Sequence, residues 1–196
     1  MARLAVLASG NGSNFQALVQ ALRSRESPAR HECVLLLHDK ESAYAAIRAR
    51  ELGIRAQHVA YHRRSRQDSE AELLAAIRES DVDVVALAGF MRLLSPAVVA
   101  ELSGRLVNIH PSILPAWPGT DSIRRAFEAG ERIFGATVHF VDEGMDTGTV
   151  IAARSFEAAP EDTLEDIERK VHEIEHCIYP NIVLELLDQA DIRRRR

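Results

Sequence analysis

The chain alternates short runs of apolar residues with longer segments in which apolar residues recur every three or four positions. The short runs predict buried β-strands, and the longer segments predict amphipathic helices. The strand-like runs are Leu4–Ala8, Cys33–His38, Ile54–Val59, Val82–Ala88, a run beginning at Leu106, Gly135–Val141 and Thr149–Phe156. The predicted helices are one that carries Phe15, Leu18, Val19 and Leu22, then 42–52, 67–79, one starting at Ser95-Pro96, 121–129 and 163–187.

Strand and helix alternate through the first two thirds of the chain, which predicts a parallel sheet. The last two strand-like runs follow each other without a helix between them, so we expect them to pair antiparallel. Thr163 and Asp166 have the spacing of a capping box at the start of the last helix. We therefore expect an α/β, Rossmann-like fold: a seven-stranded, mostly parallel sheet with helices on both faces and an antiparallel C-terminal strand pair.

Length and composition fit one globular domain, with 196 residues of which 46% are hydrophobic. We expect this domain to span residues 1–190, followed by an Arg-rich tail at 191–196 that lies in solvent. The formal net charge of −5 gives no support to nucleic-acid binding. No apolar segment approaches membrane-spanning length, and no secretory signal is visible. With Cys33 and Cys177 expected as buried free thiols, these features predict a cytoplasmic protein.

The first strand ends in the glycine-rich turn Ser9-Gly10-Asn11-Gly12-Ser13-Asn14, and a helix follows. A helix N-terminus offers unpaired N–H groups and the positive end of the helix dipole, which suits a phosphate group. The turn lacks the Lys-Ser/Thr pair of a Walker loop, and the third glycine of a dinucleotide fingerprint would fall at Phe15. A single phosphate monoester therefore fits better than a diphosphate or triphosphate. The alternative is a plain strand-to-helix turn that Ser13 or Asn14 caps.

The fifth strand runs from Leu106 into a loop that two prolines, Pro111 and Pro115, stiffen. Side chains alternate along a strand, so Asn108 and His110 point to the same face. Ligands of open α/β sheets bind at the carboxyl ends of strands, and this pair stands at such an end. From spacing alone, a ligand site and a simple polar strand end are equally good interpretations.

A second pattern, His172-Glu173-Ile174-Glu175-His176, matches the zinc-protease motif H-E-x-x-H on a predicted helix. No obvious third metal ligand follows it in the sequence. A protease also has no need of the phosphate-binding turn near the N-terminus. A metalloprotease is therefore the less favoured interpretation of this segment.

Four segments together resemble the phosphoribosylglycinamide formyltransferases, a group within the folate-dependent formyltransferase family. They are Ser9–Asn14, Ala88-Gly89-Phe90-Met91-Arg92, Asn108-Ile109-His110-Pro111-Ser112-Ile113-Leu114-Pro115 and Met145-Asp146-Thr147-Gly148. The resemblance extends from Leu4 to about Leu187 and implies the formyltransferase variant of the Rossmann-like fold. The chain departs from some members at Asp121, Ser122 and Ile123, where those members carry histidines.

The resemblance also implies roles for individual residues. Asn108, His110 and Asp146 would form a catalytic trio. Gly12, Ser13, Asn14 and Glu175 would bind glycinamide ribonucleotide, which leaves the histidines of the H-E-x-x-H pattern structural. The folate-binding residues would be Arg66, Met91, Arg92, Leu93, Leu94, Asn108, Asp142, Glu143, Gly144, Met145 and Asp146.

The implied reaction moves a formyl group from 10-formyltetrahydrofolate, a co-substrate, to the primary amine of glycinamide ribonucleotide in purine biosynthesis. Such a reaction needs an oxyanion stabiliser and a route for protons, and it needs no metal. The expected partners are small molecules only, with no nucleic acid and no membrane, and the protein would be a monomer or a homodimer. Two alternatives stay open: a 10-formyltetrahydrofolate hydrolase, and a phosphate-binding module without enzymatic activity.

Overall fold

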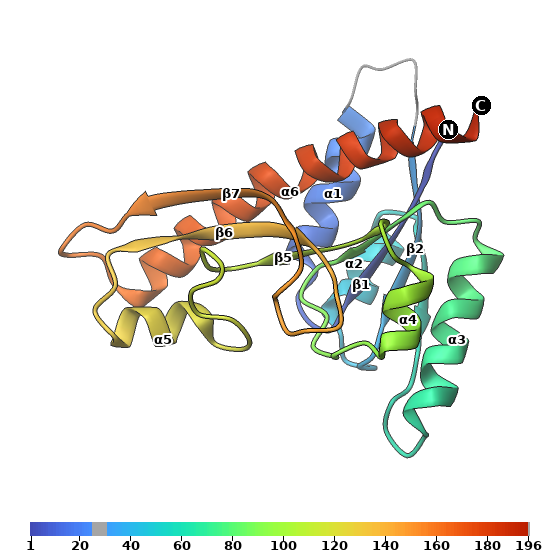
Figure 1. Cartoon of the computed structure of the whole chain (residues 1–196), viewed down its shortest axis with the longest axis horizontal. Helices are drawn as coiled ribbons and strands as arrows, with labels where there is room; N and C mark the ends of the chain where they lie inside the picture. The colour runs from blue at the N-terminus through green and yellow to red at the C-terminus, as the bar shows by residue number, and fades with distance from the viewer. Residues whose placement is uncertain (25–30, 196) are drawn as a thin grey trace.

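The computed structural model describes residues 1–24 and 31–195. Seven strands and six helices follow one another in these residues (Figure 1). The strands are β1 (Arg3–Ala8), β2 (Glu32–His38), β3 (Arg55–His58), β4 (Val84–Leu87), β5 (Leu106–His110), β6 (Ile133–Phe140) and β7 (Val150–Glu157). The helices are α1 (Ser13–Ser24), α2 (Tyr44–Glu51), α3 (Arg66–Glu79), α4 (Pro96–Glu101), α5 (Ser122–Glu128) and α6 (Leu164–Arg194).

All seven strands form one sheet in the order β3-β2-β1-β4-β5-β6-β7. The first five strands pair in parallel, and β6 runs antiparallel to both β5 and β7. The predicted α/β fold, with its mostly parallel sheet and its antiparallel C-terminal pair, is confirmed. The chain also pairs β6 with β5, so the two C-terminal strands extend the parallel sheet.

Alternating side chains of the strands build a hydrophobic core on each face of the sheet. On one face, Leu4, Val6 and Val107 pack with α1, α2 and α6. On the other face, Leu7 and Leu35 pack with α3 and α4. Figure 1 shows α1 beside α6 above the sheet, and α3 and α4 on the opposite side. Burial on both faces explains why β1 and β4 are almost continuously apolar, whereas the edge strand β3 is polar and only partly buried.

Helix α6 is longer than the predicted segment 163–187, because it continues through Pro180 to Arg194. The predicted boundary at residue 190 therefore falls inside this helix. The terminal amine of Met1 bonds to Asp191, and Arg194 forms ion pairs with Asp81 and Asp83, so contacts with β1 and the start of β4 hold the last turns. Arg194 is thus exposed but ion-paired, while Arg196 lies outside the described residues.

The two cysteines differ in their surroundings. Cys33 is buried, as expected, and its burial raises the pKa of its thiol to about 12. Cys177 is exposed, which corrects the expectation of a buried thiol, and its Sγ atom accepts a hydrogen bond of 3.3 Å from Nη1 of Arg154 in β7. Both thiols are free. Among the described residues, no helix is long and apolar enough to cross a membrane.

The order of the strands indicates at which edge of the sheet a ligand binds. The chain reverses its direction of winding at β1, because β2 and β3 lie on one side of β1 and β4 and β5 on the other. Ligands of doubly wound sheets bind beyond the carboxyl ends of the strands at such a switch point. The glycine turn after β1, the Gly89–Leu94 loop after β4 and the end of β5 all lie at this edge.

Candidate active site

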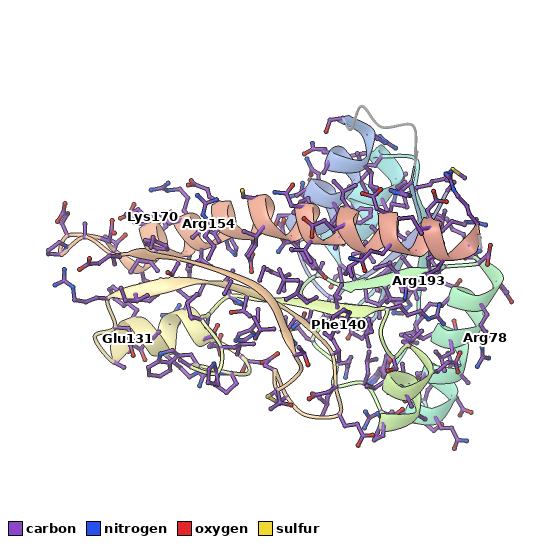
Figure 2. All side chains as sticks on the ribbon, turned by 45° about the horizontal axis from the view of Figure 1, so that its top comes forward. Arg78, Glu131, Phe140, Arg154, Lys170 and Arg193 are labelled. Carbon is purple, nitrogen blue, oxygen red and sulfur yellow. The ribbon has the colours of Figure 1, made fainter. Side chains whose placement is uncertain are left out.

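The three predicted catalytic residues meet at the carboxyl end of β5. The amide nitrogen Nδ2 of Asn108 lies 3.5 Å from Oδ1 of Asp146, and Nδ1 of His110 lies 3.4 Å from Oδ2 of the same carboxylate. Asp146 belongs to the loop that follows β6, and Figure 2 shows Phe140, the last residue of β6, in the middle of the molecule where this loop begins. Residues 38 positions apart in the sequence thus form one cluster.

A fourth polar residue, His139, belongs to the same cluster and was missed in the sequence analysis. Its Nε2 atom lies 3.2 Å from Nδ2 of Asn108 and 3.6 Å from Oδ1 of Asp146. The antiparallel register of β5 and β6 pairs Asn108 with His139 and His110 with Thr137. The alternation of Thr137 and His139 in an apolar strand was the available signal, but only the pairing of the two strands shows which residues they face.

A hydrogen bond fixes the orientation of the His110 ring. Its Nε2 atom lies 2.9 Å from the carbonyl oxygen of Trp117, which only accepts, so this nitrogen donates. Its Nδ1 atom faces the carboxylate of Asp146. The ring is buried, with an acceptor on each side.

Contacts around Asp146 favour its ionised form. The neighbouring His139 ring, the Gly119 N–H at 2.7 Å and the charge of His110 lower the pKa of the Asp146 carboxyl, although its partial burial acts in the opposite direction. Asp146 has a φ of 56°, in the left-handed region. This unfavourable backbone conformation aims the carboxylate back at the two imidazoles.

The glycine-rich turn Ser9–Asn14 joins β1 to α1, as predicted. The N–H of Gln16 donates to the carbonyl of Gly12 at 3.0 Å and opens the helical ladder. The N–H groups of Ser13, Asn14 and Phe15 therefore have no partner within the helix. Gly12 has a φ of 78°, which only glycine adopts easily. The turn thus presents free N–H groups at a point that the backbone can approach closely.

Glu175 meets this turn from α6. Its Oε2 atom accepts a hydrogen bond of 2.9 Å from Nδ2 of Asn14, while Oδ1 of Asn14 is buried without a hydrogen-bond partner. Burial raises the pKa of Glu175, and the hydrogen bond from Asn14 and the charge of His172 offset only part of this effect. A buried carboxylate and a buried unpaired amide oxygen beside the glycine-rich turn are groups that a polar ligand can satisfy.

Short contacts join the glycine-rich turn to the loop after β4. The N–H of Ser9 donates to the carbonyl of Gly89 at 3.0 Å, and the N–H of Met91 donates to Oγ of Ser9 at 2.7 Å. From the face that α1 and α6 cover, the hydroxyl of Tyr179 donates to the carbonyls of Leu87 at 2.8 Å and Val107 at 3.2 Å. These contacts fix the ends of β1, β4 and β5 relative to one another.

The residues predicted to bind folate lie around this edge but differ in what they expose. Arg66 starts α3 and donates to the carbonyl of Leu93 at 2.6 Å. Met91 and Leu93 are 59% and 55% exposed, which is unusual for large apolar side chains and leaves them open to a ligand. Leu94 is buried in the core beneath α4. Arg92 is 2.6 Å from the buried carboxylate of Asp39, so its charge is already paired.

The loop 142–148 closes the other side of the site. Oδ1 of Asp142 accepts hydrogen bonds from the N–H of Gly144 at 3.0 Å and the hydroxyl of Thr147 at 2.7 Å. This internal bonding holds the loop shape that carries Asp146. Glu143 and Met145 are exposed on the loop, and the Met145 side chain lies against Gly119. Asp121, Ser122 and Ile123 lie at the start of α5, where Ser122 and Ile123 are buried.

The H-E-x-x-H pattern, formed by His172, Glu173 and His176, lies on exposed positions of α6. Glu175 faces Asn14, whereas His172 and His176 lie on exposed positions of α6. Within residues 1–24 and 31–195, no group of three His, Cys, Asp or Glu side chains has a geometry that could hold a metal ion.

A doubly wound sheet with a glycine-rich turn and an Asn-His-Asp cluster at its carboxyl edge agrees with the formyl transferase family. The sequence matches this family over residues 2–183, and the chain belongs to it. It is 42% identical to phosphoribosylglycinamide formyltransferase of Bacillus subtilis over 95% of both chains. The enzyme of that name from Escherichia coli is 41% identical over 92% of this chain and 84% of its own.

A solved structure agrees with these relationships. The crystal structure of phosphoribosylglycinamide formyltransferase from Bacillus halodurans superposes with a TM-score of 0.90, at 39% identity and over 96% of each chain. The resemblance inferred from four sequence motifs is therefore confirmed at the level of the whole chain, and the protein is a formyltransferase.

Proposed function

We propose that the protein transfers the formyl group of 10-formyltetrahydrofolate to the primary amine of glycinamide ribonucleotide, giving formylglycinamide ribonucleotide and tetrahydrofolate in purine biosynthesis. The main support is that two candidate sites lie on the same edge of the sheet. The phosphate-binding turn after β1 and the Asn108-His110-Asp146 cluster after β5 lie on either side of the Gly89–Leu94 loop. The names of the similar proteins support the same substrate.

The residues suit direct transfer through a tetrahedral intermediate. When the substrate amine attacks the formyl carbon, negative charge develops on the formyl oxygen. An imidazolium at His110 and an amide N–H of Asn108 can stabilise that charge. The N–H of Asn108 directed at Asp146 is the easier one to redirect, because its 3.5 Å contact is the longer of the two that this nitrogen makes.

Protons must leave the attacking amine and reach the folate nitrogen before it departs. In this proposal, Asp146 keeps His110 charged and organises a water molecule that carries the proton. Gly12, Ser13 and Asn14 hold the phosphate group, and Glu175 contacts the same substrate. The residues Arg66, Met91 to Leu94 and Asp142 to Asp146 surround the folate, with Arg92 and Leu94 contributing mainly through their backbone. The proposal also includes a cytoplasmic location, small-molecule partners only, and a monomer or homodimer.

A formyl-transfer assay with purified protein tests this function. The protein is mixed with 10-formyltetrahydrofolate, with and without glycinamide ribonucleotide, and with and without a chelator. Loss of formyl-folate that requires the ribonucleotide and survives the chelator is the expected result. Loss without the ribonucleotide would indicate a hydrolase instead. Binding of the ribonucleotide with no turnover in either condition would indicate a binding module.

A further inference from the structure

Helix α2 forms the wall behind the phosphate-binding turn. The N–H of Ala45 donates to the carbonyl of Gly10 at 3.1 Å. A Cβ atom on Gly12 would lie only 2.7 Å from Cβ of Ala45, so the turn and the helix are in tight contact. Arg48 lies three residues after Ala45 and therefore on the same face of α2.

The guanidinium group of Arg48 donates hydrogen bonds to residues on both sides of the turn. Its Nε atom donates to the carbonyl of Asn11 and its Nη2 atom to Oδ1 of Asn11, each at 2.9 Å. Its Nη1 atom donates to Oε1 of Gln16 in the first turns of α1. The group also lies 5.0 Å from the centre of the Tyr44 ring. A planar group with several donors can hold a loop in this way, whereas a lysine cannot.

The charge of Arg48 is left available to a ligand. The oxygens that accept its three hydrogen bonds belong to a backbone carbonyl and to two side-chain amides, all of which are neutral. The residues of the turn, Ser9 to Asn14, carry no charge, and the first turn of α1 contains no acidic residue. A phosphate dianion at this helix start would therefore meet partial positive charges from the backbone and one full charge from Arg48.

We propose that Arg48 is a positioning residue of the phosphate site. It holds Asn11 and Gln16 so that the N–H groups at the start of α1 converge on the phosphate, and its charge attracts the dianion. Arg48 thereby makes the enzyme select a phosphorylated acceptor over the same acceptor without phosphate. This inference deepens the proposed function, because it concerns the phosphate group of the same substrate.

Three variants of the full chain test the role of Arg48. Arg48→Met removes the charge and the hydrogen bonds, and Arg48→Lys keeps the charge but loses the planar group. Arg50→Met removes the same charge from an exposed position of the same helix and serves as the matched control. The probes are ribose 5-phosphate, with affinity measured by calorimetry, and two acceptors: glycinamide ribonucleotide and its dephosphorylated riboside.

Arg48→Met is expected to weaken ribose 5-phosphate binding, and to raise the KM for the ribonucleotide, by about tenfold or more. The kcat, the KM for formyl-folate and the kcat/KM for the riboside are expected to stay at wild-type values. Arg48→Lys is expected to fall between wild type and Arg48→Met, and Arg50→Met to match wild type. A purely structural residue would instead lower the kcat/KM for both acceptors together.

Several results would overturn this role. They are equal losses with the ribonucleotide and the riboside, unchanged ribose 5-phosphate affinity in Arg48→Met, full recovery in Arg48→Lys, or an equal loss in Arg50→Met. The test separates this inference from the proposed function. If no variant or wild type transfers formyl groups, but Arg48→Met still weakens ribose 5-phosphate binding, only the proposed function fails. If transfer occurs and Arg48 variants behave like wild type, only this inference fails.

Discussion

Replacing Asp146 with asparagine removes the charge that faces His110 while keeping almost the same shape. The asparagine oxygen can still accept the hydrogen bond from the N–H of Gly119, so the loop can hold its position. The carboxylate that the substitution removes lies close to His110, with Oδ2 of Asp146 3.4 Å from Nδ1 of His110. Asp146→Asn therefore tests the electrostatic role of the carboxylate with little structural change.

The distance sets the size of the expected effect. Two unit charges at that separation attract by about 5 kcal/mol at an effective dielectric constant of 20. This figure is an upper limit, because the Asp146 side chain is 13% exposed and solvent therefore screens part of its charge. Since each 1.36 kcal/mol is about a tenfold change in rate, we expect kcat to fall about 100- to 1,000-fold.

Steady-state formyl transfer, followed with each substrate varied in turn, measures this effect. KM values for both substrates are expected to stay near those of wild type, because the interaction acts on the charge that develops during reaction. Glu157→Gln makes the same change of charge at an exposed position of β7 and is expected to match wild type. A kcat of Asp146→Asn within threefold of wild type, or a higher KM at unchanged kcat, would refute the role given to Asp146.

Three other variants test separate parts of the site. Gly12→Ala places a methyl group 2.7 Å from Ala45 at a positive φ, so ribose 5-phosphate affinity measured by calorimetry should be lost; unchanged affinity would contradict the tight packing of the turn. Tyr179→Phe loses hydrogen bonds to two strand carbonyls and should lower the urea-unfolding free energy by about 1–3 kcal/mol. Burial raises the pKa of Glu175, so its ionisation opposes folding as the pH rises above the unfolded value of about 4.3. In urea titrations, Glu175→Gln should therefore be more stable than wild type at about pH 8, and the difference should be much smaller at about pH 5. An equal difference in stability at both pH values would contradict this. The same variant should bind the ribonucleotide more weakly.

The order and type of the elements could be predicted because each one has its own local pattern. The strand from Leu4, the glycine turn and the helix that buries Phe15, Leu18 and Val19 all lie where the apolar spacing placed them. The capping box of Thr163 and Asp166 is present at the start of α6. Such features depend on residues close in the sequence, so a single sequence contains them.

The features that were wrong or missed depend on contacts between distant residues. Helix α6 extends to Arg194 because Asp81 and Asp83, more than a hundred residues earlier, hold its last turn. His139 joins the site because β6 pairs with β5 in one particular register, and a shift by one residue would turn it away. The pairing of Arg92 with the buried Asp39 likewise spans 53 positions.

The same reasoning explains why the grouping of Asn108, His110 and Asp146 could be predicted only from the resemblance to a family. The spacing of Asn108 and His110 on one strand was visible in the sequence, whereas the approach of Asp146 depends on a loop that returns from the far end of β6. The motif around Asp146 was similar to that of known formyltransferases, and the structure now supplies the physical link: an acceptor that faces both His110 and Asn108.

The most direct test of the account follows the formyl carbon itself. The protein is given 10-formyltetrahydrofolate with an isotopically labelled formyl group, together with glycinamide ribonucleotide, and the products are read by nuclear magnetic resonance. The account predicts that the label appears on the glycinamide nitrogen, one equivalent for each tetrahydrofolate formed. Label recovered as free formate in the presence of the ribonucleotide would contradict direct transfer at the Asn108-His110-Asp146 site.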